Sequence, residues 1–184
     1  MLPKGRKNIR TKVFVYSLWF IDDYTGGSKT SNLKTQISNN MTSISKNFTL
    51  EELTASATAK AKGIRNQPGQ TDVINLCALV HKVLQPLREA MGQPIKIGSG
   101  YRSLALNTAV GGVRNSQHQY GQAADLCIDG DLQKGKRWFE WIKSHCDFDQ
   151  LIWEHNSKGN YWVHVSYRAD GRNRKQVINN LLKK

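Results

Sequence analysis

The sequence predicts an α+β protein in which a small antiparallel sheet is flanked by helices. Apolar residues recur at three- and four-residue steps through residues 71–91, the spacing of one buried helix face. Residues 162–167 instead alternate between two faces, with Val163, Val165 and Tyr167 on the apolar one, which is typical of a strand. A length of 184 residues allows one compact domain with extensions, and would be cramped for two.

The first element is predicted to be a helix that begins after Thr49. Thr49 and Glu52 have the spacing of a capping box, and Phe48 can pack on Leu53 as its hydrophobic staple. Gly, Ser, Thr, Asn and Lys dominate the residues between Thr25 and this cap, a composition that buries too little apolar surface to fold alone. We therefore expect residues 1–47 to be a basic, flexible extension.

The beginning of the chain leaves two interpretations open. A basic stretch followed by the apolar run 13–21 is similar to the front of a signal peptide, but Asp22 and Asp23 stand where a cleavage site needs small residues. Met41 is an alternative biological start. No apolar run reaches the ~18 residues of a spanning helix, so the sequence predicts no transmembrane segment.

The remaining elements follow from periodicity and from turn residues. The helix over 71–91 should be kinked late by Pro86, with His81 off its apolar stripe and facing solvent. Further along the chain we expect strands at 94–98, 123–128, 150–154 and 162–167, and helices at 104–110 and 132–146. The domain should therefore span residues 48–167, and the basic residues 168–184 should form a solvated tail.

The charge of the chain favours polyanionic partners. There are 27 Lys and Arg residues against 14 Asp and Glu, a net charge of +13, which suits nucleic acid, anionic lipid or a bacterial cell wall. The sequence has no helix-turn-helix, zinc-finger or basic-aromatic sheet motif, so we do not expect nucleic acid. Three scattered cysteines offer neither a disulfide framework nor a C-x-x-C zinc module.

Polar residues of the predicted strands converge on one face of the sheet. If Ala124 and Leu126 face the core, Asp125 faces away from it, and His164 does the same in the last strand. Glu154 would lie opposite His164 or diagonal to it, depending on whether the hairpin turn is centred near Gly159 or on Lys158.

With a loop histidine, His118, these residues resemble the donor set of catalytic zinc, which uses His and carboxylate ligands and leaves another carboxylate free as a base. Scattered His and carboxylates are also common without a metal. On the residues alone, His118 can equally be a surface loop histidine and His164 a sheet residue satisfied by hydrogen bonds.

Two motifs resemble the zinc D-alanyl-D-alanine carboxypeptidase family, which includes D,D-dipeptidases of vancomycin resistance and phage L-alanyl-D-glutamate endolysins. The first runs from Ser99-Gly100-Tyr101-Arg102-Ser103 to the pattern S-x-H-x-x-G-x-A-x-D at residues 116–125, and the second is residues 162–167 around His164. Residues 149–154 are similar to the phage and prophage subgroup. The resemblance covers roughly residues 48–167 and implies a Hedgehog/D,D-peptidase-like zinc peptidase fold.

By position, the resemblance implies that His118, Asp125 and His164 hold one zinc ion. It also implies that Arg102 contacts the substrate and polarises its carbonyl, and that Ser116 lies beside the first ligand as a substrate-binding residue.

The catalytic base departs from the family pattern. Many relatives have an acidic base three residues before the last histidine, where this chain has Tyr161. We assign the role to Glu154 on the partner strand. The neighbouring His155 is expected to be exposed at the turn, although it could assist.

The resemblance implies zinc-dependent hydrolysis of an amide bond in peptidoglycan stem peptides, of the D-Ala-D-Ala carboxypeptidase or the L-Ala-D-Glu endopeptidase type. Tyr161 motivates one alternative, an inactive zinc-containing wall-binding module. Charge alone motivates the other, a nucleic-acid-binding protein. We expect a monomer that acts at the periplasmic or extracellular face of the cell wall, or stays cytoplasmic until lysis if it is of phage origin.

Overall fold

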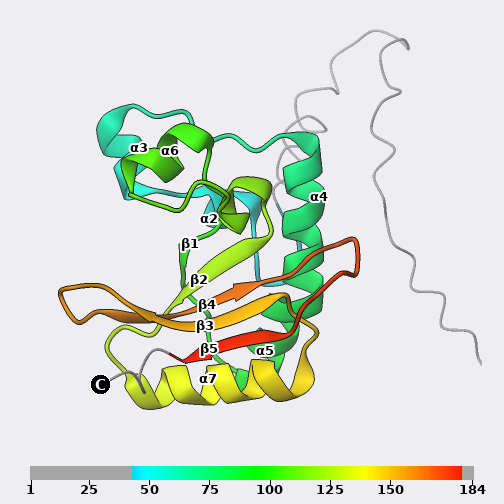
Figure 1. The fold of residues 1–184 in the computed structure, drawn as a ribbon. Coiled ribbons are helices and arrows are strands. Elements are labelled where there is room, and N and C mark those ends of the chain that lie inside the picture. The colour runs from blue at the N-terminus through cyan, green and yellow to red at the C-terminus, as the bar shows by residue number, and fades with distance from the viewer. Residues whose placement is uncertain (1–42, 180–184) are drawn as a thin grey trace, which may run out of the picture.

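A computed structural model describes residues 43–179, so the expectations for residues 1–42 and 180–184 lie outside the described residues. Helices surround one five-stranded sheet (Figure 1). The elements are α2 (Leu50–Thr54), α3 (Ala57–Lys62), α4 (Gln70–Leu79), the π-helix η1 (Val80–Leu84), α5 (Gln85–Met91), β1 (Ile97–Ser99), α6 (Leu104–Ala109), the 3-10 helix η2 (Gln117–Tyr120), β2 (Ala123–Cys127), α7 (Leu132–His145), β3 (Gln150–His155), β4 (Tyr161–Ser166) and β5 (Gln176–Asn179).

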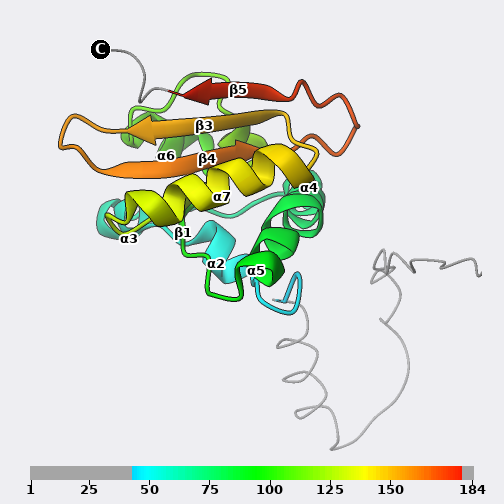
Figure 2. The ribbon, with the colours of Figure 1, turned by 90° about the horizontal axis from the view of Figure 1, so that it is seen from below.

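The predicted α+β class is confirmed. The strand order is β1-β2-β4-β3-β5, and the first four strands are antiparallel, whereas β5 runs parallel to β3. Helix α7 lies along one face of the sheet, and α6 lies on the other side of it (Figures 1 and 2). No helix within residues 43–179 is long and apolar enough to cross a membrane.

One hydrophobic core joins the helices to the sheet. It buries Leu76 and Leu79 of α4, Trp138 of α7, and Val163 and Val165 of β4. Because side chains alternate along a strand, burying Val163 and Val165 turns the residue between them toward the opposite face. The core thereby decides which face of β4 carries polar groups.

The N-terminal cap forms as predicted, and order begins before it. Thr49 Oγ1 accepts a hydrogen bond from the Glu52 backbone at 3.1 Å, and Phe48 is buried. Residues 43–47, which the sequence analysis placed in the extension, contact α5: Ser45 Oγ donates to Gln85 Oε1 at 2.8 Å. The described part of this segment therefore packs against the domain.

The helix is distorted before Pro86, where we expected only a kink near the proline itself. Proline has no N–H and its ring clashes with the carbonyl four residues back, here that of Lys82. The chain widens into the π-helix η1 over Val80–Leu84 and then returns to α-helix in α5. His81 in this turn is exposed, as predicted.

The strand β5 lies within the segment that we expected to be a solvated tail. Asp149, the residue before β3, is fully buried, and Arg174 donates to its carboxylate through Nε at 2.9 Å and Nη2 at 2.6 Å. The guanidinium holds the pKa of Asp149 below its usual range. The polar composition of residues 168–179 gave no strand pattern. The contact that holds this segment on the sheet is with a distant carboxylate, Asp149.

Candidate metal centre

The structure brings together the three predicted ligands, His118, Asp125 and His164. Asp125 of β2 is paired with His164 of β4 across the sheet, and η2 supplies His118. His164 Nδ1 lies 2.9 Å from Asp125 Oδ1, and His118 Nε2 lies 3.3 Å from each of those two atoms. All three side chains are largely buried.

The spacing of these atoms fits a small tetrahedral metal ion. Zinc ligands lie about 2.0–2.1 Å from the ion, so tetrahedral angles separate two donor atoms by roughly 3.3 Å. Two of the three separations have that value and the third is 2.9 Å. Two imidazoles and one carboxylate also leave a fourth position open, as catalytic zinc requires. The residues present therefore fit zinc.

Gly100 orients His118. The Gly100 carbonyl accepts a hydrogen bond from His118 Nδ1 at 2.7 Å, which leaves Nε2 with its lone pair facing the other two donors. A Cβ atom at residue 100 would lie 2.2 Å from the Leu53 carbonyl oxygen, so only glycine brings the backbone this close to α2. The glycine of the first sequence motif thus fixes the ring nitrogen that could hold a metal.

Asp125 lies between the histidines and Arg102. Burial alone raises the pKa of its carboxyl, but the charges and hydrogen bonds of His118 and His164 outweigh burial and hold the pKa well below its usual range. Arg102 forms an ion pair with the other carboxylate oxygen and donates to Ser99 Oγ at 2.7 Å. Arg102 thus has the structural salt bridge that could also account for its presence, and it faces the metal-binding residues.

Glu154 lies on the face of the sheet that carries His164. Ile152 pairs with His164 and Glu154 with Trp162, so Glu154 is the diagonal neighbour of His164, the second of the two predicted registers. The indole Nε1 of Trp162 donates to Glu154 Oε2 at 2.8 Å. Glu154 also lines the groove that contains the three candidate metal ligands.

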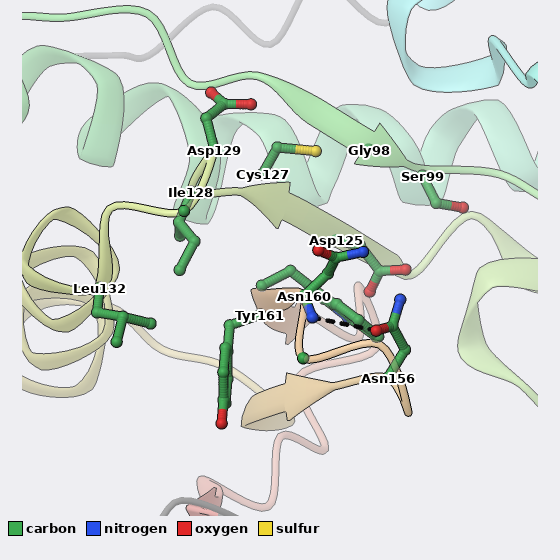
Figure 3. Close-up of a pocket in the computed structure, with 13 residues that line it drawn as sticks. Gly98, Ser99, Asp125, Cys127, Ile128, Asp129, Leu132, Asn156, Asn160 and Tyr161 are labelled. Carbon is green, nitrogen blue, oxygen red and sulfur yellow. Dashed lines mark hydrogen bonds between the residues drawn. The ribbon is translucent and has the colours of Figure 1, made fainter.

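Tyr161 and His155 lie on the other face. Tyr161 is three residues from His164, and an odd separation along a strand places two side chains on opposite faces. The Tyr161 ring packs 5.3 Å from the ring of His155, and it points away from Asp125 (Figure 3). An acidic residue at position 161 of this chain would therefore face away from the metal centre, and His155, which is exposed, does so too.

An open groove of about 890 Å³ contains all the predicted site residues. Arg102 and the buried Ser116 line it together with the three candidate ligands and Glu154. A second hollow of about 550 Å³ adjoins it at Asp125 and Trp162 and extends to the turn between β3 and β4 (Figure 3). Asp125 and Trp162 therefore line both hollows.

Sequence reasoning missed three groups in this groove. Trp162 donates to Glu154, Gln117 lines the groove beside the candidate ligand His118, and Arg174 arrives from the C-terminal segment. The alternation that placed His164 on the polar face also placed Trp162 there, so its position could have been found from the strand pattern. No local signal indicated Gln117 or Arg174.

Two histidines and a carboxylate in an open groove are a donor set that metallohydrolases use to hold a catalytic metal ion. The model of the family described as Peptidase M15 matches residues 46–166, more than half of the chain. This chain belongs to the peptidase M15 family.

A curated relative agrees with this assignment. Over 44 residues the chain is 54% identical to the zinc D-Ala-D-Ala carboxypeptidase of Streptomyces albus G. That match covers 23% of this chain and 17% of the length of the relative.

Proposed function

We propose that this protein is a zinc peptidase that hydrolyses an amide bond in the stem peptides of bacterial peptidoglycan. The observation that carries the proposal is the placement of three metal donors and one further carboxylate, Glu154, on one face of an open groove. The similarity to the zinc D-Ala-D-Ala carboxypeptidase of Streptomyces supports zinc and a D-Ala-D-Ala bond. The D-Ala-D-Ala carboxypeptidase type and the L-Ala-D-Glu endopeptidase type are both compatible with the groove.

The proposed residues divide the work of hydrolysis. His118, Asp125 and His164 would hold zinc, which when bound polarises a water molecule and the substrate carbonyl. Glu154 would take a proton from the attacking water and return it to the leaving amine. Ser116 and Arg102 would contact the substrate from the groove wall.

The surroundings of the proposed enzyme follow from its charge and its substrate. A net charge of +13 would hold it near the carboxylates and phosphodiesters of a cell wall. We propose that it acts as a monomer at the periplasmic or extracellular face of the wall. A phage origin, with the protein in the cytoplasm until lysis, would give it the same substrate.

Arg102→Lys is expected to keep zinc and fold but to lower kcat/KM by about 10- to 100-fold. Lysine preserves the charge beside Asp125 but loses the planar fork that can bind Asp125 and a substrate oxygen together. Zinc content, thermal unfolding and turnover of a stem peptide measure the three effects. Arg65→Lys is the control, because Arg65 is exposed and bonds only to Gln67. Unchanged turnover would reduce Arg102 to a structural partner of Asp125.

The test of the proposed function uses defined muropeptides. Protein loaded with one equivalent of zinc should release fragments, and protein treated with a chelator should release none. Mass spectrometry of the products identifies the bond: free D-Ala indicates the carboxypeptidase type, and cleavage after L-Ala indicates the endopeptidase type. Binding to the wall without any released fragment would instead favour the inactive wall-binding module.

A further inference from the structure

The end of the groove near β5 contains a guanidinium that is fixed in place. Besides the two side-chain hydrogen bonds to Asp149, the Arg174 backbone N–H donates to the same carboxylate at 3.1 Å. Asp149 is itself held by the neighbouring strands, since its backbone N–H donates to Ser166 at 2.7 Å and its carbonyl accepts from Gln176 at 2.9 Å. These hydrogen bonds hold the Arg174 guanidinium against Asp149 in the wall of the groove.

This guanidinium still has a free edge toward the groove. Asp149 is fully buried and binds Nε and Nη2, whereas the Arg174 side chain is 55% exposed and lines the groove that contains the candidate metal ligands. Nη1 has no hydrogen-bond partner among residues 43–179. A guanidinium presents its N–H groups in a planar fork, and the pairing of one edge with a carboxylate leaves the other edge able to bind an anion.

Gln117 is a further polar residue in the lining of the groove. It contributes, after Arg174, to holding the pKa of Asp149 below its usual range, and the next residue in the chain is the candidate ligand His118. Gln117 Oε1 is buried and has no partner among the described residues, although it lies in the lining of the groove. This oxygen is closed to solvent, so a substrate cannot reach it and the anion-binding edge at this end of the groove is that of Arg174.

The distance along β3 between Asp149 and the metal ligands indicates which part of a bound substrate Arg174 can reach. Asp149 precedes Ile152, the partner of His164, by three residues. Strands rise about 3.3 Å per residue, which places Asp149 roughly 10 Å from the level of the metal ligands, or about three residues of an extended peptide. This site is therefore separate from the position of the bond that is cut.

We propose that Arg174 binds a free carboxylate of the peptide substrate, two to three residues from the scissile amide. The proposal rests on the proposed function and adds a specificity for acidic substrates. Arg174 lies beyond residues 46–166, the part of the chain that matches the family model, so this specificity would come from the C-terminal segment. The carboxylate can be an acidic group within the peptide or its C-terminus.

Three synthetic stem peptides separate these two sources. The first has both carboxylates free, the second has only the internal carboxylate converted to a carboxamide, and the third has only the C-terminus amidated. The parent protein should lose about 10- to 100-fold in kcat/KM for one of the two amides, the range expected for a lost hydrogen bond to a charged group. That amide identifies the carboxylate bound by Arg174.

The variants test whether Arg174 is responsible. Arg174→Gln combined with Asp149→Asn removes the guanidinium without leaving a buried charge, and it should hydrolyse the acid and the amide at similar rates. Arg174→Lys, which can keep the ion pair, should retain part of the preference. Arg172→Gln should keep the parent preference, because Arg172 is exposed and pairs with Asp170 outside the groove. If the ion pair of Arg174 with Asp149 were only structural, the double variant would lose the same factor in kcat/KM on all three peptides. That result would overturn the proposal.

Calorimetry of the same peptides separates this proposal from the proposed function. Binding reports the preference for acid over amide whether or not the parent cleaves the peptides. Preferential binding without cleavage would retain the carboxylate site and reject the peptidase. Cleavage without any preference in rate or binding would retain the peptidase and reject the carboxylate site.

Discussion

Glu154→Gln is expected to lower turnover of stem peptides by about 100- to 10,000-fold while zinc stays bound, which is the range for loss of a general acid or base. Glutamine has almost the same shape, and its Oε1 can still accept the hydrogen bond from Trp162 Nε1. It cannot accept a proton at neutral pH, so the variant removes the chemistry and keeps the geometry. Initial rates on a defined muropeptide, with zinc content measured on the same samples, check both parts.

Glu140→Gln is the matched control for this experiment. Glu140 lies on α7, is exposed, and forms only a loose pair with Lys143 at 3.6 Å, so its loss should leave turnover unchanged. Parent-like turnover of Glu154→Gln with zinc in place would show that another group is the base. His155 is a poor replacement, because it lies on the opposite face of the sheet beside Tyr161.

Alanine at His118, Asp125 or His164 is expected to reduce bound zinc from one ion to none and to abolish hydrolysis. Each substitution removes one of the three donor atoms that lie 2.9–3.3 Å apart, and two remaining donors hold zinc too weakly to survive dialysis. Metal analysis after dialysis measures the stoichiometry. His81→Ala should bind zinc normally, because His81 is exposed on η1. Full zinc in the His164→Ala protein would remove His164 from the ligand set.

Zinc occupancy is also expected to fall in mild acid, and the histidines should cause the loss. An imidazole must be neutral to bind a metal, so protons compete with zinc at His118 and His164. The pKa of Asp125 is held well below its usual range, so this carboxylate stays ionised while the imidazoles take up protons. A titration of zinc content against pH, followed in parallel by histidine NMR signals, should show the two changes together. Zinc release without histidine protonation would contradict this order of events.

Local patterns were sufficient to predict most of the elements. The Thr49 cap, the helical stripe over residues 71–91 and the alternation over residues 162–167 each depend on neighbours in the chain, and each formed. The same alternation turned Asp125 and His164 to one face, because a strand side chain has only two directions to take. The motif resemblance then supplied His118, whose loop position periodicity cannot fix.

Tertiary structure decided what depended on distant partners. The hairpin register, left open by the sequence, places Glu154 diagonal to His164 and in reach of the Trp162 indole. The strand β5 pairs with β3, and just before β5 Arg174 pairs with Asp149, a carboxylate buried 25 residues earlier in the chain. The residue patterns near each partner carry no signal for such pairings. They arise only when the fold brings distant segments together, and Asp149 then needs a partner because a buried carboxylate left unpaired is strongly destabilising.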